Sequence, residues 1–464
     1  MRIVLADPPL TGDRQADMIS YPNIGVLSLF GYLRERLPGH ELIYVGSLDI
    51  GEHVERIASL EPDVYGVSFA TCMEKLSYEL INRVRERLPR LPIITGGPHP
   101  TALPAEVMEN CEADICVVGE GEQTFLEVVG HIMAGGDDWG SIPGLAYRHD
   151  GEIVFSEPRG FLPIADIPMP AWDLVDLGDY MGNQLCKNKP GTCILTSRGC
   201  PYDCVFCSNP VWKSARPWLR MRAPESIAAE VDYLYGRGVR ELYIRADEFN
   251  ADLKWSLEVC RAIAALGHTD LYFQCNLRAD KVDDELAAAL VSINCWMVHL
   301  GIESWNQRVL DGIEKHIKVE DVISACRTLK RAGISVYGFL MLYQVWEEDG
   351  ELRWETADEV DHTIRTTRRM MKSGLLDYMS WQFATPFPGS RMYDIVARHD
   401  LVRGGVKGVW DMSLRLPGIS ERRMKHQRLK GFIIQSYYSL RSGGINWRFW
   451  RRILNKLKYM VESV

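Results

Sequence analysis

Three cysteines, Cys200, Cys204 and Cys207, stand close together in the spacing C-x3-C-x2-C. Thiolates are the usual protein ligands of iron–sulfur clusters and of structural zinc. A structural zinc ion takes four ligands, and no histidine lies near these cysteines in the sequence. Three thiolates therefore favour a four-iron cluster with one iron left open to a substrate or cofactor. The alternatives are a zinc site completed by Cys186 or Cys193, or three buried cysteines without a metal.

Glycine-rich loops form a second group of candidates, at positions 68–72, 96–101 and 119–122. Glycine lets the backbone approach a bulky ligand closely, and serine or threonine hydroxyls bond its amides or phosphate. The alternative is that the GG and GEG sequences are simple turns. No G-x-G-x-x-G motif follows the first predicted strand, which disfavours a dinucleotide site.

Short apolar runs alternate with amphipathic segments before residue 135. The predicted strands are Arg2–Ala6, Glu41–Val45, Val64–Phe69, Ile93–Thr95 and Ile115–Val118. The predicted helices are 25–37, 54–60, 75–88 and 124–133. This alternation predicts an α/β, doubly wound domain with a parallel sheet. Its ligand site should lie beyond the carboxyl ends of the strands, where the three loops are.

A second series of alternating elements follows the cysteines. The predicted strands are Cys193–Thr196, Glu241–Arg245, Leu271–Cys275, Met297–Gly301, Ser335–Leu342 and Met379–Ala384. The predicted helices are 224–237, 252–266, 282–292, 306–311, 319–332 and 353–373. Six βα units predict a partial (β/α)6 TIM-like barrel with its chemistry at the carboxyl ends of the strands.

An aromatic residue, Phe206, precedes the third cysteine. With it, the motif resembles that of the radical S-adenosylmethionine (SAM) superfamily. The resemblance implies that Cys200, Cys204 and Cys207 each bind one iron of a 4Fe-4S cluster and that SAM chelates the fourth. The reduced cluster would cleave SAM to methionine and a 5′-deoxyadenosyl radical, which abstracts hydrogen from an unactivated C–H bond.

The same resemblance implies four SAM-binding residues at barrel strand ends: Asp247, Glu248, Arg278 and Glu303. The first two would lie where the SAM amino group is held, the third near its carboxylate and the last near its ribose or adenine. Ordinary surface ion pairing is the alternative for the last two. The 385–390 loop matches the closing loop of the subgroup, whereas 338–348 departs from its usual Gly-Pro loop.

A doubly wound domain before a radical SAM core resembles the cobalamin-binding subgroup. That subgroup includes class B radical SAM methyltransferases and the anaerobic magnesium-protoporphyrin ester cyclase type. The resemblance implies seven cobalamin-binding residues in the glycine-rich loops: Ser68, Thr71, Gly96, Gly97, His99, Thr101 and Glu120. The D-x-H-x-x-G motif of cobalt-ligating domains is missing, since Asp7 is followed by two prolines. We therefore expect no protein histidine on cobalt.

These patterns predict four regions of the chain. They are a cobalamin-binding Rossmann-like domain over 1–135, a connector over 136–189, a radical SAM core over 190–395 and a helical, basic C-terminal region over 396–464. The connector contains a predicted hairpin around Asp150-Gly151.

The composition is that of a globular protein, with 464 residues of which 46% are hydrophobic and 25% charged. The net charge of −9 disfavours nucleic-acid binding. No apolar run predicts a membrane-spanning helix, and the N-terminus does not resemble a secretion signal, so we expect a cytoplasmic protein. Between residues 421 and 464 stand eleven Lys or Arg and two Glu, with aromatics interleaved. They predict a basic amphipathic helix that lies on an anionic membrane or covers the acidic remainder of the chain.

The leading hypothesis is a cobalamin-dependent radical SAM enzyme that methylates an unactivated carbon through methylcobalamin. The second is an oxidative cyclase or rearrangement enzyme with the same cofactors, and the third is a non-catalytic redox or light sensor. The expected partners are a small-molecule substrate of unknown class and an electron donor such as flavodoxin or ferredoxin. Four tryptophans could line a pocket for a flat or lipid-like molecule, although aromatics near strand ends are more often core: Trp212, Trp218, Trp346 and Trp381.

Overall fold

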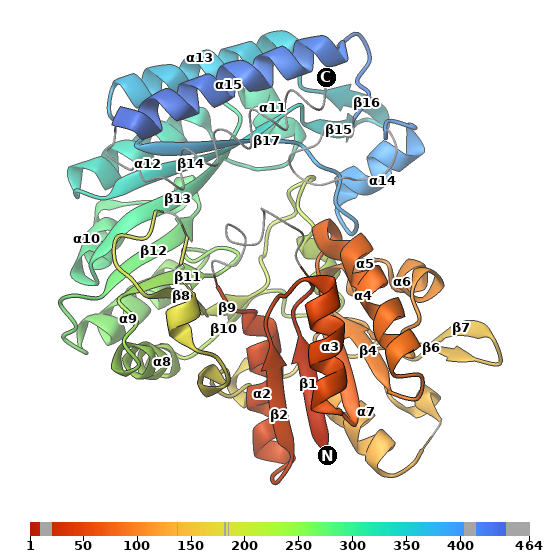
Figure 1. Ribbon diagram of the computed structural model, residues 1–464. Coiled ribbons are helices and arrows are strands. Elements are labelled where there is room, and N and C mark those ends of the chain that lie inside the picture. Colours follow the sequence, from red (N-terminus) through yellow and green to blue (C-terminus); the bar gives the residue numbers. More distant parts are fainter. Residues whose placement is uncertain (10–20, 137, 181, 184, 403–413, 442–464) are drawn as a thin grey trace.

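The computed structural model describes residues 1–464 except 10–20, 137, 181, 184, 403–413 and 442–464. It contains two main β-sheets, each flanked by helices, and the two lie next to each other (Figure 1). The first sheet belongs to the N-terminal part of the chain and the second to the part after the cysteines. The fold is therefore the predicted α/β pair of domains.

The first sheet has seven strands in the order β2-β1-β3-β4-β5-β6-β7. Five are parallel: β1 (Arg2–Ala6), β2 (Glu41–Val45), β3 (Val64–Ser68), β4 (Ile93–Gly96) and β5 (Ile115–Val117). The helices between them are α2 (Ile24–Arg36), α3 (Ile50–Leu60), α4 (Glu74–Arg87), α5 (Pro98–Ala102), α6 (Pro104–Asn110) and α7 (Gly121–Met133). Apolar residues of α2 and α7 pack on one face of the sheet, and those of α3 and α4 on the other. Both faces are covered, as the continuous apolar strands require.

The predicted hairpin around Asp150-Gly151 forms, as β6 (Leu145–His149) and β7 (Glu152–Phe155). It lies antiparallel to β5 and extends the first sheet by two strands. The sheet therefore reaches into the segment that the sequence pattern places in the connector.

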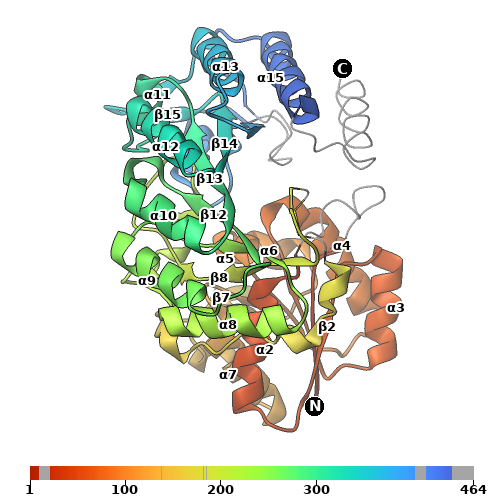
Figure 2. The same cartoon turned by 90° about the vertical axis from the view of Figure 1, so that its left-hand side faces the viewer.

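The second sheet has six parallel strands in the order β17-β14-β13-β12-β11-β8. They are β8 (Gly191–Leu195), β11 (Glu241–Arg245), β12 (Tyr272–Leu277), β13 (Cys295–Glu303), β14 (Ser335–Leu342) and β17 (Tyr378–Phe383). The helices are α8 (Pro224–Gly236), α9 (Leu253–Ala264), α10 (Asp284–Ser292), α11 (Gln307–Gly312), α12 (Val319–Arg331) and α13 (Ala357–Lys372). Figure 2 shows α9, α10 and α12 along the outer side of the sheet. This is the predicted partial barrel.

One predicted helix overlaps a strand of the structure. The segment after β14 forms a hairpin of β15 (Val345–Glu348) and β16 (Glu351–Trp354), and the helix expected from residue 353 begins at Ala357 instead. Asp349 and Gly350 both have positive φ, at 51° and 78°, which suits a two-residue hairpin turn. The hairpin lies where the sequence departs from the subgroup.

Two helices follow the barrel, α14 (Arg391–Arg398) and α15 (Glu421–Arg441). Helix α15 lies beside α13 and β17 (Figures 1 and 2). Arg423 pairs with Asp361 of α13 at 2.6 Å, and the amide of Gln435 donates to the carbonyl of Met379 at 2.8 Å. Residues 421–441 of the basic region thus cover a neighbouring part of the chain, and residues 442–464 lie outside the described residues. Among the helices that the structure describes, none is long and apolar enough to cross a bilayer.

Candidate functional site

The cysteine loop follows the carboxyl end of β8. The short strands β9 (Ser197–Arg198) and β10 (Arg220–Met221) pair and close its base. Gly199 has a φ of 81°, and a Cβ there would collide with the carbonyl of Trp218. Only glycine fits this close approach, so the residue before Cys200 is fixed by backbone geometry.

The centre of the loop is tied to the barrel. The amide of Val205 donates to the carbonyl of Ile313 at 2.9 Å, and its carbonyl accepts from the amide of Met392 at 2.9 Å. The amide of Asn209 donates to the Cys207 sulfur at 3.4 Å. The loop is therefore held from both sides, with its three thiols over the carboxyl ends of the strands.

The three thiols share one electrostatic environment. Burial raises the pKa of Cys200 to about 12 and that of Cys207 to about 11. Burial also raises the pKa of Cys204, while Lys315 and Arg278 act in the opposite direction. Neutral, half-buried thiols need a further positive charge to become thiolates, and iron supplies it.

The alternative zinc site does not fit this arrangement. The sulfur ligands of one zinc ion lie about 4 Å apart, as its bond lengths require. In the part of the chain that the structure describes, the only three possible ligand atoms within 4.8 Å of one another belong to Glu74, His99 and Glu106. At least two of the three cysteine sulfurs therefore lie more than 4.8 Å apart. Cys186 packs against Gly191, at the opposite end of β8 from the triplet.

Two carboxylates stand at the end of β11, beside the cysteine loop. Asp247 accepts a hydrogen bond from the amide of Gly199, and burial raises its pKa. Burial raises the pKa of Glu248 to about 7, against the opposing effect of Lys315 and Arg278. One carboxylate oxygen of Glu248 is buried without a hydrogen-bond partner. An unpaired acceptor here suits a hydrogen-bond donor of a ligand, such as an amino group.

Arg278 and Glu303, the other two predicted SAM residues, are both buried. The Arg278 guanidinium lies 3.8 Å from the ring centroid of Tyr202 in the cysteine loop and pairs with Asp280 at 2.8 Å. Its side chain also donates to the carbonyl of His316 at 3.0 Å. These contacts are internal, so Arg278 is no surface residue, and its visible role is to support the cysteine loop.

Glu303 pairs with Lys315 at 3.0 Å between ammonium and carboxylate. Burial alone would lower the pKa of Lys315, but the surrounding acidic groups, Glu303 first, together outweigh it and raise that pKa above its usual value. The Lys315 ammonium also lies 5.7 Å from the ring centroid of Phe206. The sequence pattern did not identify Lys315, because no motif surrounds it. Only the fold brings Lys315 beside Glu303 at the end of β13.

A buried ion-pair network joins the cysteine loop to the first domain. Arg198 pairs with Glu122 at 2.5 Å and with Glu120 at 3.3 Å, and Arg220 also pairs with Glu120. Burial alone would raise the pKa of Glu122, but Arg198 outweighs it and holds that pKa below its usual range. Glu120 and Glu122 follow β5. The network therefore connects the base of the cysteine loop to the segment after β5, where a predicted cobalamin-binding loop lies.

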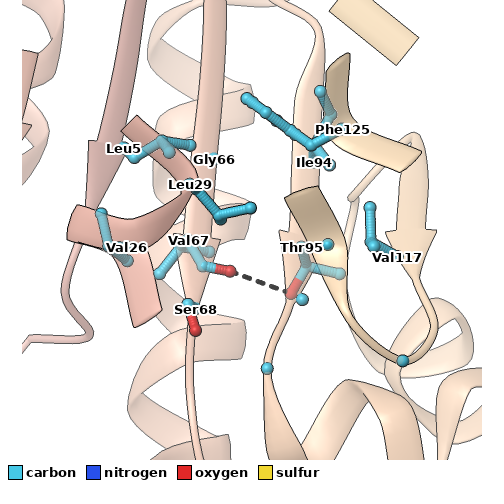
Figure 3. Close-up of a pocket in the computed structure, with 14 residues that line it drawn as sticks. Leu5, Val26, Leu29, Gly66, Val67, Ser68, Ile94, Thr95, Val117 and Phe125 are labelled. Atoms are coloured by element: carbon cyan, nitrogen blue, oxygen red, sulfur yellow. Dashed lines mark hydrogen bonds between the residues drawn. The ribbon is translucent and has the colours of Figure 1, made fainter. Parts of the chain in front are cut away.

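An apolar slot opens at the carboxyl ends of the first sheet, between the strands and helices α2 and α7 (Figure 3). Its volume is about 420 Å³, part of it open to solvent. Its lining is mainly aliphatic and glycine: Leu5, Val26, Leu29, Gly66, Val67, Ser68, Ile94, Thr95, Gly96, Gly97, Val117, Gly119, Gly121 and Phe125. A Cβ on Gly97 would lie 2.7 Å from the Ser68 hydroxyl, so the loops leave no room for a side chain there.

The seven predicted cobalamin residues divide into two sets. Ser68, Gly96 and Gly97 line the slot. The others are Thr71, His99, Thr101 and Glu120, which the structure engages in contacts within the protein. The imidazole of His99 is fully buried between the hydroxyls of Thr71, at 3.1 Å, and Tyr78, at 2.9 Å.

Comparison with known proteins gives two family models. The Radical SAM superfamily model matches residues 194–360, and the B12 binding domain model matches residues 19–129. The first covers the cysteine loop and most of the barrel, and the second covers most of the slot.

Two curated relatives match across most of the chain. An uncharacterized methyltransferase, PH0819, of Pyrococcus horikoshii is 28% identical over 87% of this chain and 84% of its own length. The anaerobic magnesium-protoporphyrin IX monomethyl ester cyclase of Synechocystis is 30% identical over 72% of this chain and 67% of its own length.

A solved structure shares the whole fold. The cobalamin-dependent SAM radical enzyme OxsB matches with a TM-score of 0.73 and 17% identity, covering 99% of this chain and 71% of the other. At this identity the match concerns the fold alone. Together with the cysteine loop and the slot, the family matches lead to one conclusion. The chain belongs to the cobalamin-binding family of radical SAM enzymes, the family of the cobalamin-dependent radical SAM methyltransferases.

Proposed function

We propose that this protein transfers a methyl group to an unactivated carbon of a small molecule. The observation that carries the proposal is the Arg198–Glu122 and Arg220–Glu120 network, which fixes the cysteine loop against the cobalamin-binding sheet. When bound, the cluster and SAM supply a 5′-deoxyadenosyl radical, and cobalamin supplies a transferable methyl group. Methyl transfer needs both groups beside one substrate, and the network provides that proximity.

The protein's own residues divide the work. Cys200, Cys204 and Cys207 hold the cluster, and Lys315 and Arg278 support them with positive charge and packing. Glu248 and Asp247 would accept N–H hydrogen bonds from the SAM amino group. The apolar slot takes the flat base of the cobalamin nucleotide, while the loops that begin at Ser68 and Gly96 hold the larger ring system above it.

Replacing Gly97 with alanine should weaken cobalamin binding at least tenfold. Gly97 has a φ of 100°, and the new Cβ would lie 2.7–3.0 Å from Ser68 and Phe69, so the loop must move away from the slot. The matched control is Gly130→Ala in α7, where no atom lies within 4 Å of the added Cβ and alanine favours the helix. Equilibrium dialysis with hydroxocobalamin measures both variants. Equal binding by both would contradict the assignment of the slot.

SAM binding should tighten as the pH rises from 6 to 8. Burial raises the pKa of Glu248 to about 7, so its carboxyl is mostly protonated at pH 6 and mostly ionised at pH 8. Only the ionised form accepts hydrogen bonds from the SAM amino group at both carboxylate oxygens, which predicts an affinity gain of about tenfold over this range. Calorimetric titration of cluster-loaded protein measures it. Glu248→Gln should bind weakly and lose the dependence, and a pH-independent wild type would remove Glu248 from the site.

An anaerobic assay tests the function itself. Cluster-loaded protein is incubated with cobalamin, SAM and a strong reductant, and S-adenosylhomocysteine and 5′-deoxyadenosine are quantified together. The proposal predicts both products, since one SAM gives up its methyl group and a second is cleaved to the radical. The second candidate is a cyclase-type reaction, which the Synechocystis relative favours. It predicts 5′-deoxyadenosine without S-adenosylhomocysteine.

The setting of the reaction is part of the proposal. A one-electron donor of the flavodoxin or ferredoxin type reduces the cluster, and the reducing cytoplasm is the compartment proposed. All twelve cysteines lie in described parts of the chain and all are free thiols, which supports a reducing environment. Helix α15 packs against α13, so the basic residues of 421–441 have contacts within the protein. Membrane contact is therefore proposed only for residues 442–464.

A further inference from the structure

The inner face of the second sheet is unusual for a barrel. Side chains alternate between the two faces of a strand, and Ile244, Val298 and Val336 point into the helix-covered core. Their neighbours in sequence therefore face inward. Strand pairing aligns these neighbours in one row across all six strands: Leu195, Arg245, Asn276, His299, Tyr337 and Tyr378. Branched aliphatic residues usually fill such rows, and here only the first is aliphatic.

Aromatic rings make this row a continuous surface. His299 lies 4.9 Å from Tyr337 and 5.1 Å from Tyr243 between ring centroids, and Phe339 lies 5.6 Å from His299. Tyr337 in turn stacks on Tyr378 at 6.4 Å. The rings of Tyr337, Phe339 and Tyr378 are only partly buried. Stacked, partly accessible rings offer a planar surface to a planar ligand.

A cation stands at the edge of the aromatic surface. Arg245 is exposed, although it belongs to an inward-facing row, and its guanidinium lies 5.8 Å from the ring centroid of Tyr243 and 6.0 Å from that of Tyr21. Within the described parts of the chain it forms no ion pair with a carboxylate. A guanidinium that is left unpaired beside aromatic rings is suited to bind an acidic ligand group.

The row lies at the right depth for a substrate. Arg245 and Asn276 each come two residues before predicted SAM residues, Asp247 and Arg278, on their strands. Two residues of strand span about 7 Å, so the row lies one layer below the SAM position. The imidazole of His299 also has a buried nitrogen, Nδ1, without a hydrogen-bond partner, which a ligand could satisfy.

We infer that the barrel interior binds a planar, unsaturated substrate that carries an acidic group, with the ring on Tyr337 and Phe339 and the acid on Arg245. The inference rests on the proposed function, because it assigns the substrate of the same site. It restricts that substrate to a chemical class. Saturated or uncharged molecules of the same size are excluded by it.

Three naphthalene compounds test the inference on cluster- and cobalamin-loaded protein under anaerobic titration calorimetry. Naphthalene-2-carboxylate has both the ring and the charge, naphthalene-2-carboxamide lacks the charge, and decahydronaphthalene-2-carboxylate lacks the unsaturated ring. The carboxylate should bind at least tenfold more tightly than either analogue. Arg245→Met should remove the preference over the amide, and Tyr337→Leu the preference over the saturated acid. Equal binding of all three compounds, or no binding of any, would overturn the inference.

A matched control separates this surface from aromatic–cation pairs elsewhere. Arg237 lies 5.9 Å from the ring centroid of Tyr233 on the outside of α8, and Arg237→Met should leave all three affinities unchanged. The same protein preparations are then incubated anaerobically with SAM and a strong reductant and assayed for S-adenosylhomocysteine. If it forms while the carboxylate binds Arg245→Met as tightly as wild type, the substrate class is wrong and methyl transfer stands. If carboxylate binding depends on Arg245 but no S-adenosylhomocysteine forms, the inference is supported and the proposed function is wrong.

Discussion

A Cys204→Ala variant should retain its fold and lose the cluster together with 5′-deoxyadenosine formation. Cys204 is proposed as one of three protein ligands, and both Lys315 and Arg278 act to lower the pKa of its thiol. Removing one member of a unit that works together typically costs a factor on the order of 10³ or more in rate. Iron content, the visible spectrum of the cluster and 5′-deoxyadenosine yield measure the effect.

Cys186→Ser is the matched control. Cys186 is also a partly buried cysteine near β8, but it packs against Gly191 at the other end of that strand. It should keep full iron content and full 5′-deoxyadenosine yield. If Cys186→Ser lost its metal as Cys204→Ala does, and zinc were the metal found, the four-cysteine zinc site would be correct and the cluster assignment wrong.

The second large effect is expected at Glu122. Its partner Arg198 is mostly buried, with 14% of its side chain exposed, so Glu122→Gln leaves a buried charge without its main counterion. Breaking one side of a buried pair costs about 3–5 kcal/mol of unfolding free energy. Because Arg198 stands two residues before Cys200, the substitution should also reduce methyl transfer more than it reduces cluster content.

An exposed pair provides the comparison. Arg34 and Asp173 form a salt bridge at 2.7 Å with about 45% of each side chain exposed, and Asp173→Asn should cost less than about 1 kcal/mol. Chemical denaturation followed by circular dichroism measures both variants. Equal small losses in the two variants would show that the network between the domains contributes nothing to stability.

The pH dependence of the Glu122 contribution has a definite sign. Arg198 holds the folded pKa of Glu122 below its ordinary value, so the ionised form is favoured in the folded protein. The stabilisation is therefore complete above the ordinary pKa of a glutamate, near 4.5, and is lost as the pH falls through the lower folded value. The difference in stability between wild type and Glu122→Gln should shrink below about pH 4.

The sequence predicted the frame of the molecule well, because its strands are short apolar runs with clear ends. Strands β1, β2, β11 and β14 have the predicted bounds. The hairpin after β14 was missed although the pattern contains its signal, an Asp349-Gly350 pair between alternating residues. The end of its second strand, residues 353 and 354, was included in the predicted helix, which in the structure begins at Ala357.

The candidate cofactor loops stand out in the sequence by their residue types, whereas the residues that contact them do not. Cys200, Cys204 and Cys207 carry their chemistry in their spacing. Lys315 and Arg198 carry no such signal, since a lone basic residue acquires meaning only from the carboxylates that the fold places beside it.

The substrate surface was also beyond the sequence pattern. Of the four tryptophans considered for a pocket, Trp346 and Trp381 are buried in the core at 2% and 4% exposure, the more common role of aromatics near strand ends. Tyr337 and His299 form the aromatic surface instead. Alternation in the sequence predicts which residues of one strand share a face. It does not predict the register that aligns those residues across six strands.

Transfer of a labelled methyl group is the most direct test of the proposed function. Cluster-loaded protein is incubated anaerobically with cobalamin, reductant and SAM that carries a deuterated methyl group, and the protein-bound cobalamin is analysed by mass spectrometry. The arrangement of the two domains predicts that the label appears on cobalamin in amounts equal to the S-adenosylhomocysteine released. The label should decrease in Gly97→Ala, which loosens the cobalamin loops. Formation of 5′-deoxyadenosine with cobalamin bound but unlabelled would contradict methyl transfer and leave the cyclase-type reaction.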